Sequence, residues 1–323
     1  MSARQGGAAG FRRRGRTLVV GCGFIGSRVV TELIESGDTP TVLTRSRPRY
    51  GVDPRLPAKN LLVGNAGSRE TVEEALEGID QVVYSAGGLL PAASEREPER
   101  DTELTMAPLR TVLAALRERS DASIAYLSSG GTVYGDPEQI PVDEEEPTCP
   151  RGIYGELHVR CEQEVLREIR DHGLRARILR CSTVYGEGQQ PDRGQGVIAT
   201  FLGRIERNEP VELYGGGSTI RDYLYVGDLA RIITALLPHD DGPAVLNVGS
   251  GEGTSLAKIL SLVEAEVGKT ATVIHHEERA FDVHRIVLDI SRLQELVSIP
   301  GTPLAQGIHL THRWLQTVAQ EVA

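Results

Sequence analysis

The sequence lacks the features that define several large classes of protein. It has no excess of positive charge, because Asp and Glu outnumber Lys and Arg by 45 to 35 and the formal net charge is −10. Proteins that wrap nucleic acid need clustered Lys and Arg to neutralise the phosphates, so a nucleic-acid partner is not expected. No run of residues approaches the roughly 20 apolar residues of a membrane-spanning helix, so no membrane partner is expected either.

Cysteine is also scarce. The chain has four cysteines, which are too few for a disulfide scaffold and lack the spacing of metal ligands: Cys22, Cys149, Cys161 and Cys181. We therefore expect no metal site and a reducing, cytoplasmic location. The one dense basic run, within residues 12–16, has no apolar segment behind it and does not resemble a signal peptide, so residues 1–16 are expected to form a flexible basic tail.

What the sequence does contain is an alternation of short apolar segments with helical patterns. Strands are predicted at 17–20, 41–43, 60–63, 81–84, 123–127 and 177–179, and helices within 27–36, 68–76, 103–117 and 154–171. Several of the strands are continuous apolar runs, which indicates a parallel sheet that is covered on both faces. A chain of 323 residues exceeds the usual size of one core, so we expect two lobes.

Three glycines join the first predicted strand to the first predicted helix. Gly21, Gly23 and Gly26 form the pattern G-x-G-x-x-G, which allows a tight turn and lets a pyrophosphate approach the N-terminus of the helix. This context predicts an α/β fold of the Rossmann type, with a doubly wound parallel sheet that binds a dinucleotide. We expect the dinucleotide-binding domain to span 17–185, and a smaller C-terminal substrate lobe, interleaved with the last sheet elements, to span 186–323.

The end of the second strand bears on the choice of cofactor. In dinucleotide folds an acidic residue about 20 residues beyond the glycines holds the ribose hydroxyls of NAD. Here the segment reads Thr44-Arg45-Ser46-Arg47, which contains no carboxylate but has two guanidinium groups that suit a 2′-phosphate. NADP(H) is therefore favoured over NAD(H), which remains the alternative.

A series of strings along the chain resembles one enzyme family. The strings are Gly-Phe-Ile-Gly-Ser (23–27), Ser-Ser-Gly-Gly-Thr-Val-Tyr-Gly (128–135), Pro-Val-Asp-Glu (141–144), Tyr-Gly (154–155), Val-Tyr-Gly (184–186), Arg-Asp-Tyr-Leu-Tyr-Val (221–226) and Asn-Val-Gly-Ser-Gly (247–251). Through them the sequence, from residue 18 to about residue 314, is similar to the extended short-chain dehydrogenase/reductases, and within them to the NAD-dependent epimerase/dehydratase group. The resemblance implies an enzyme that acts on a nucleotide-activated sugar.

The resemblance also assigns residues to the cofactor site. The first group lies in the glycine-rich turn and at the start of the helix that follows it: Gly21, Gly23, Phe24, Ile25 and Gly26. The second group follows the next three strands: Thr44, Arg45, Asn65, Ala66, Ser85 and Ala86. His158 is expected to meet the nicotinamide ribose.

The catalytic pair departs from the family pattern. In the family a Tyr acts as general acid or base, and a Lys one helical turn later binds the nicotinamide ribose and lowers the Tyr pKa. Tyr154 matches the Tyr, but the Lys position is occupied by His158. Neutral imidazole offers a weaker positive field than ammonium, so we expect Tyr154 to be less acidic than in a typical member. Arg160 lies on another face of the helix and is not expected to substitute.

A second departure concerns the hydroxyl that binds the reacting sugar oxygen in the family. Gly130 stands at that position, and the flanking Ser129 and Thr132 are predicted to supply the hydroxyl instead.

In the substrate lobe the resemblance assigns phosphate contacts to two arginines. Arg221 matches the Arg that grips the diphosphate, and Arg279 with Asp282 matches an R-x-x-D pair near the nucleotide. Arg193 lies in a segment that resembles the loop over the base. Thr183 replaces the Asn that commonly precedes Val-Tyr-Gly, which puts one phosphate contact in doubt.

Three functions remain open from the sequence. The favoured one is an NADPH-dependent 4-ketoreductase of a nucleotide-activated deoxysugar, because a released cofactor suits net reduction. The second is an NAD-dependent 4-epimerase of a nucleotide sugar, and the third is a non-catalytic cofactor-binding protein. By resemblance, a homodimer would form through the helices near 103–117 and 154–170.

Overall fold

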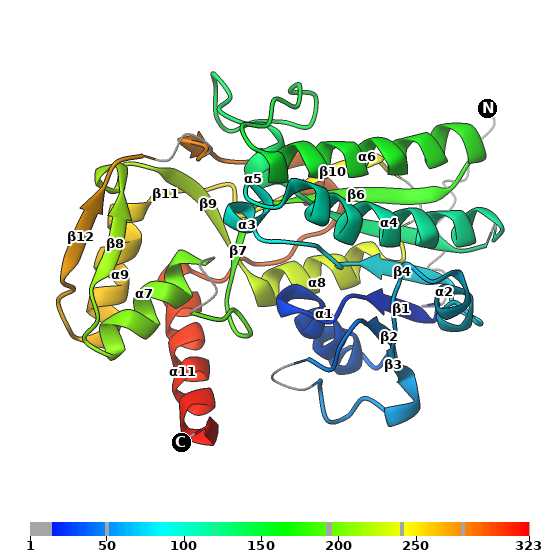
Figure 1. Cartoon of the computed structure of the whole chain (residues 1–323), viewed down its shortest axis with the longest axis horizontal. Helices are drawn as coiled ribbons and strands as arrows, with labels where there is room; N and C mark the ends of the chain where they lie inside the picture. The colour runs from blue at the N-terminus through cyan, green and yellow to red at the C-terminus, as the bar shows by residue number, and fades with distance from the viewer. Residues whose placement is uncertain are drawn as a thin grey trace, which may run out of the picture.

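A parallel sheet forms the centre of the molecule. The computed structural model describes residues 15–48, 52–119, 121–191, 196–239, 242–278 and 282–322. Within these ranges seven parallel strands form the main sheet, in the order β10-β6-β5-β4-β1-β2-β3 (Figure 1). They are β1 (Thr17–Val20), β2 (Thr41–Thr44), β3 (Leu61–Val63), β4 (Gln81–Tyr84), β5 (Ser123–Ser129), β6 (Arg175–Cys181) and β10 (Val245–Val248). The predicted doubly wound α/β fold is confirmed.

Helices cover both faces of this sheet. One face carries α2 (Arg69–Ala75), α4 (Pro98–Arg117) and α6 (Ile153–His172), and the other carries α1 (Phe24–Glu35), α8 (Val226–Leu236) and α10 (Ser291–Leu296). Alternate residues of β1 point to the two faces. Leu18 and Val20 pack into the first layer, formed with α2, α4 and α6, and Val19 packs into the second, formed with α1, α8 and α10. A strand that is buried on both faces must be apolar at every position, which explains its continuous apolar run.

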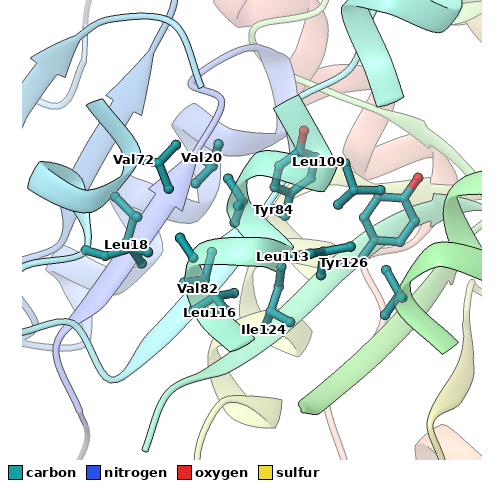
Figure 2. Close-up of a cluster of buried hydrophobic side chains, with 14 of the residues drawn as sticks. Leu18, Val20, Val72, Val82, Tyr84, Leu109, Leu113, Leu116, Ile124 and Tyr126 are labelled. Atoms are coloured by element: carbon teal, nitrogen blue, oxygen red, sulfur yellow. The ribbon is translucent and has the colours of Figure 1, made fainter. Parts of the chain in front are cut away.

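The first of these layers forms a continuous core. Figure 2 shows Leu18, Val20 and Val82 of the sheet in one cluster with Leu109, Leu113 and Leu116 of α4. Tyr84 and Tyr126 lie in the same cluster, with ring centroids 5.9 Å apart.

Helix α4 is longer than the sequence pattern predicted. The prediction began it at residue 103, whereas the structure begins it at Pro98. Proline is favoured in the first turn of a helix, and Glu99 and Asp101 place negative charge near the positive end of the helix dipole. The apolar periodicity starts only after this turn, so it underestimates the length of the helix.

The order of the strands reverses between β1 and β4. The chain runs outward through β2 and β3, returns to β4, and continues through β5 and β6 on the other side. At the reversal the Ser85 backbone N–H donates to the Val20 carbonyl oxygen over 2.9 Å, and its hydroxyl donates to the Gly21 carbonyl oxygen over 2.8 Å. In open α/β sheets, ligands bind beyond the carboxyl ends of the strands at such a reversal.

A smaller lobe lies beyond these strand ends (Figure 1). In its mixed sheet β9 (Ile220–Tyr225) pairs with β7 (Thr183–Tyr185), β11 (Gly253–Ser255) and β13 (Arg285–Ile286), and a separate parallel pair joins β8 (Val211–Tyr214) to β12 (Val273–His276). Its helices are α7 (Val197–Glu206), α9 (Leu256–Val267) and α11 (Leu304–Val322). The chain leaves this lobe to form α8 and β10 in the main domain and then re-enters it.

The remaining short elements connect these parts. They are α3 (Pro91–Ser94), α5 (Gly130–Val133), η1 (Ala58–Asn60) and η2 (Gly215–Gly217). In the part of the chain that the structure describes, no helix combines the length and the apolar character needed to cross a bilayer.

Candidate active site

The glycine-rich turn fits a dinucleotide pyrophosphate. Gly21 has φ +92°, and a Cβ on it would lie 2.6 Å from the Ala86 Cα atom; a Cβ on Gly26 would lie 1.9 Å from the Gly21 carbonyl oxygen. These two glycines are therefore required by packing. A Cβ on Gly23, in contrast, would have no described atom within 4 Å, so this face of the turn is open.

The same turn leads into the N-terminus of α1. Gly23 is the N-cap of this helix, and no side chain of the described residues caps it. The first N–H groups therefore face the open side of the turn, where a phosphate would satisfy them. Phe24 and Ile25, the first helical residues, pack against the core of the smaller lobe.

The predicted adenosine contacts lie at neighbouring strand ends. Thr44 is buried at the end of β2, and its hydroxyl donates to the Ser46 carbonyl oxygen over 3.0 Å. Arg45 and Arg47 are exposed there. After β3, the Asn65 side-chain oxygen accepts a hydrogen bond of 2.9 Å from the Gly67 N–H, with Ala66 partly buried against the core. All of these residues stand on the side of the sheet where the glycine-rich turn lies, because parallel strands end at the same edge.

Helix α6 presents Tyr154 to the end of β5. The Ile153 N–H donates to the Glu95 carboxylate over 2.7 Å, which fixes the first turn of the helix. A Cβ on Gly155 would lie 3.0 Å from the Thr132 carbonyl oxygen, so the glycine lets α6 approach the segment that follows β5. The Tyr-Gly pair thus brings the helix against the backbone of Thr132 and the phenol near Ser129.

The two predicted hydroxyls differ in their contacts. Ser129 lies beside Tyr154 and acts to lower the pKa of its phenol. Thr132 instead donates to the Ser129 carbonyl oxygen over 3.2 Å. At Gly130 itself a Cβ would lie 2.8 Å from the Arg180 carbonyl oxygen and 2.8 Å from Leu288 Cδ1, so this position has no room for a side chain unless the backbone moves.

The surroundings of Tyr154 favour its protonated form. The side chain is half-buried, and burial together with the negative charge of Asp101 raises its pKa to about 12. The neighbouring Ser129 acts in the opposite direction and lowers the pKa of Tyr154, because a hydroxyl can stabilise the phenolate. The phenol is therefore protonated at neutral pH.

His158 lies one turn after Tyr154 on the same face of α6. The centroids of the two rings are 4.6 Å apart, and their planes are inclined by 58°. Burial lowers the pKa of His158 to about 4, against a smaller opposing effect from Asp101, so its imidazole is neutral at pH 7. Arg160 is exposed and lines a depression of about 170 Å³ between α4 and α6.

The sequence analysis missed two residues beside this pair. Asp101 on α4 is 1% exposed. One of its carboxylate oxygens accepts hydrogen bonds from the Leu89 N–H (2.7 Å) and the Thr105 hydroxyl (3.0 Å). The other oxygen has no hydrogen-bond partner among the described residues. Tyr126 on β5 places its hydroxyl oxygen 3.3 Å from His158 Nδ1. The only sequence signal for Asp101 is an acid in the first turn of a helix, which is common for other reasons.

In the smaller lobe, Arg221 lies on β9 between β11 and β13. Its guanidinium donates to the Ile220 carbonyl oxygen over 2.9 Å and to the Val283 carbonyl oxygen. Thr183 on β7 directs its hydroxyl oxygen toward Gly131, within 3.7 Å of the position that a Cβ would take there, so it adjoins the segment that follows β5.

Two predicted substrate residues, Arg193 and Arg279, lie outside the described residues. Asp282 is described and partly buried. No group of three or more His, Cys, Asp or Glu side chains that could hold a metal ion occurs within the described ranges.

Known proteins resemble this chain over nearly its whole length. The UDP-glucose 4-epimerase of Azospirillum brasilense is 30% identical, over 95% of this chain and 94% of its own. The dTDP-4-dehydro-6-deoxyglucose reductase of Escherichia coli is 28% identical, over 92% of this chain and 96% of its own.

Solved structures also match this chain over nearly its whole length. The UDP-glucose 4-epimerase of Thermotoga maritima, crystallised with UDP-glucose, has a TM-score of 0.84 and 28% identity, and the match covers 94% of this chain and 99% of that one. The UDP-glucose 4-epimerase of Thermus thermophilus, in complex with NAD, has a TM-score of 0.83 and 28% identity, and the match covers 93% and 99%.

The model of one protein family matches residues 17–249, which is well over half of the chain and includes the glycine-rich turn, Tyr154 and Arg221. This match confirms the resemblance on which the predicted NAD(P)-dependent enzyme rests. The chain belongs to the NAD dependent epimerase/dehydratase family.

Proposed function

We propose that the protein is an NADPH-dependent 4-ketoreductase of a nucleotide-activated deoxysugar. Tyr154 donates its phenolic proton to the carbonyl oxygen, and Ser129 holds the phenol in place. When bound, NADPH supplies the hydride to the carbonyl carbon, so the ketone becomes an alcohol and NADP⁺ is released. Arg221 and Arg279 bind the substrate diphosphate, and Arg193 belongs to the loop over the nucleotide base; Arg193 and Arg279 lie outside the described residues.

The observation that carries this proposal is the set of residues at the end of β2. Arg45 and Arg47 are exposed there, and the segment from Thr44 to Arg47 contains no carboxylate that would repel a 2′-phosphate. A charge-assisted contact contributes ~1.5–3 kcal/mol, which corresponds to roughly a ten- to hundredfold preference for NADPH over NADH. A cofactor of this type that exchanges with solution supports net reduction.

The state of Tyr154 supports the same direction of reaction. An epimerase must first remove a proton from a sugar hydroxyl, and that step needs a phenolate. A ketoreductase needs only a phenol that arrives protonated. The pKa of about 12 favours the phenol, and the neutral His158 offers little to stabilise the phenolate.

A second candidate is an NAD-dependent 4-epimerase of a nucleotide sugar. It is favoured by the identity of 30% to the UDP-glucose 4-epimerase of Azospirillum brasilense. In that case the nicotinamide nucleotide would remain bound through both half-reactions and no external reductant would be consumed.

The experiment begins with the nucleotide that copurifies with the protein, followed by titration with NADPH and NADH. We expect NADPH to bind about ten to a hundred times more tightly. In the double variant Arg45→Ala, Arg47→Ala this preference should disappear, while NADH affinity stays unchanged.

The second part supplies a 4-keto nucleotide sugar and follows nicotinamide absorbance and the sugar product. We expect one NADPH to be oxidised for each ketone reduced. Interconversion of UDP-glucose and UDP-galactose without added reductant would instead establish the epimerase. Binding of cofactor with no turnover of either substrate would support the non-catalytic alternative.

A further inference from the structure

Tyr126 and His158 form a pair that the family pattern does not account for. The Tyr126 hydroxyl oxygen lies 3.3 Å from His158 Nδ1. Tyr126 is 2% exposed and lies in the core between the sheet and α4, where Figure 2 shows it beside Tyr84. His158 therefore stands between two phenols: Tyr126 in the core and Tyr154 at the candidate site, whose ring centroid is 4.6 Å from that of His158.

The role of this pair depends on the tautomer of His158. A neutral imidazole has one N–H and one lone pair, and the hydrogen bond at one nitrogen decides which nitrogen carries the proton. The Tyr126 hydroxyl has a single proton; His158 Nδ1 lies 3.3 Å from its oxygen, and the Cys161 thiol is another polar neighbour. A thiol sulfur is a weak acceptor, so the imidazole nitrogen takes the proton.

We propose that Tyr126 is a positioning residue that holds His158 in the Nε2–H tautomer, so that Nε2 donates to the nicotinamide ribose. Because Nδ1 accepts from Tyr126, the proton of the neutral ring resides on Nε2. His158 then presents one fixed donor where an ammonium group would present three mobile ones. The proposal rests on the proposed function in taking His158 to face the ribose.

The hydroxyl and the ring of Tyr126 have separate roles. The ring fills the core in company with Tyr84, whereas only the hydroxyl meets His158. Removal of the hydroxyl leaves Nδ1 without its donor, and the proton can then move to Nδ1. In that tautomer Nε2 can only accept, so the contact to the ribose is lost although the imidazole is still present.

The test compares Tyr126→Phe with Tyr84→Phe. Both variants delete one phenolic oxygen from the same buried cluster and keep the ring, and the two ring centroids are 5.9 Å apart. The first readout is nitrogen-15 NMR of the histidine side chains without any cofactor, with the His158 signal assigned by its loss in His158→Gln. The second readout is the dissociation constant of NADPH.

We expect His158 in the unaltered protein to give the neutral Nε2–H pattern. Tyr126→Phe should change that pattern and weaken NADPH binding about two- to tenfold, the value of one neutral hydrogen bond. Tyr84→Phe should leave both readouts unchanged. An imidazolium or Nδ1–H pattern in the unaltered protein would overturn the proposal, as would a Tyr126→Phe protein with an unchanged pattern.

The two readouts separate this proposal from the proposed function. The tautomer is measured without substrate or cofactor, so it is decided even if the protein reduces no sugar. If Tyr126→Phe fails to fold, the pattern of the unaltered protein still decides which nitrogen carries the proton. A protein with the Nε2–H pattern that binds neither NADPH nor NADH would contradict the contact to the ribose and the proposed function together.

Discussion

The glycine-rich turn after β1 and the start of α6 next to the end of β5 lie at the same end of the parallel sheet, yet they depend on sequence in different ways. In the turn, Gly21 and Gly26 have no room for a side chain, whereas Gly23 leaves an open face. On α6 the proposed chemistry depends on side chains instead, and His158 replaces the Lys of the family pattern there. The proposed cofactor contacts through the main chain therefore follow the family pattern, whereas the proposed proton transfer takes place beside an altered side chain. The two properties should respond separately to mutation.

The largest expected effect comes from Tyr154→Phe. This change removes the proposed proton donor but keeps the ring next to His158. General acid catalysis contributes about 10²–10⁴-fold, so turnover should fall by that factor. The dissociation constants of NADPH and the sugar nucleotide, measured by calorimetry, should stay within about a factor of two. Near-native turnover would remove Tyr154 from its assigned role.

A pair of glycine variants tests the turn. In Gly26→Ala the new Cβ would meet the Gly21 carbonyl oxygen at 1.9 Å, so the backbone must shift. Overpacking of this kind costs about 1–3 kcal/mol, which denaturant unfolding should detect as a lower midpoint. NADPH binding should weaken as well.

Gly23→Ala is the matched control for that variant, because the same methyl group enters open space. Its unfolding free energy should change by less than about 0.5 kcal/mol. NADPH affinity should nevertheless fall, since the methyl group occupies the face that the pyrophosphate approaches. Equal destabilisation by the two variants would show that Gly23 is also required for packing.

The smallest effect at neutral pH is expected from His158→Lys. A general acid must be protonated, so the rate of reduction falls as pH rises through the pKa of Tyr154, which burial and Asp101 raise to about 12. An ammonium group stabilises the phenolate and should lower that pKa by about 1–3 units. The pH–rate profile should then decline at a lower pH than in the unaltered protein. The control, His158→Gln, adds no charge and should show no such shift; a basic limb that stays in place in His158→Lys would mean that position 158 does not act on Tyr154.

The main strands and the family motifs could be predicted because they depend on local pattern. Apolar runs located the six predicted strands of the main sheet, whereas β10 was not singled out. It joins the sheet only after the chain has passed through the smaller lobe, and its pairing with β6 is a contact between distant segments. The first turn of α4 was missed because its polar residues carry no apolar periodicity.

The sequence by itself determined the α/β fold, the glycine-rich turn, the Tyr154–His158 pair and the family, because each depends on residue types at short spacings. The tertiary structure alone decided what surrounds that pair. Asp101 and Tyr126 come from α4 and β5, and the order of the sheet brings them to α6. A pKa depends on burial and on charges a few ångströms away, whatever their distance along the chain. For that reason the effects of burial and of Asp101 on the pKa of Tyr154, and the hydrogen-bond partner of His158, could be read only from the folded molecule.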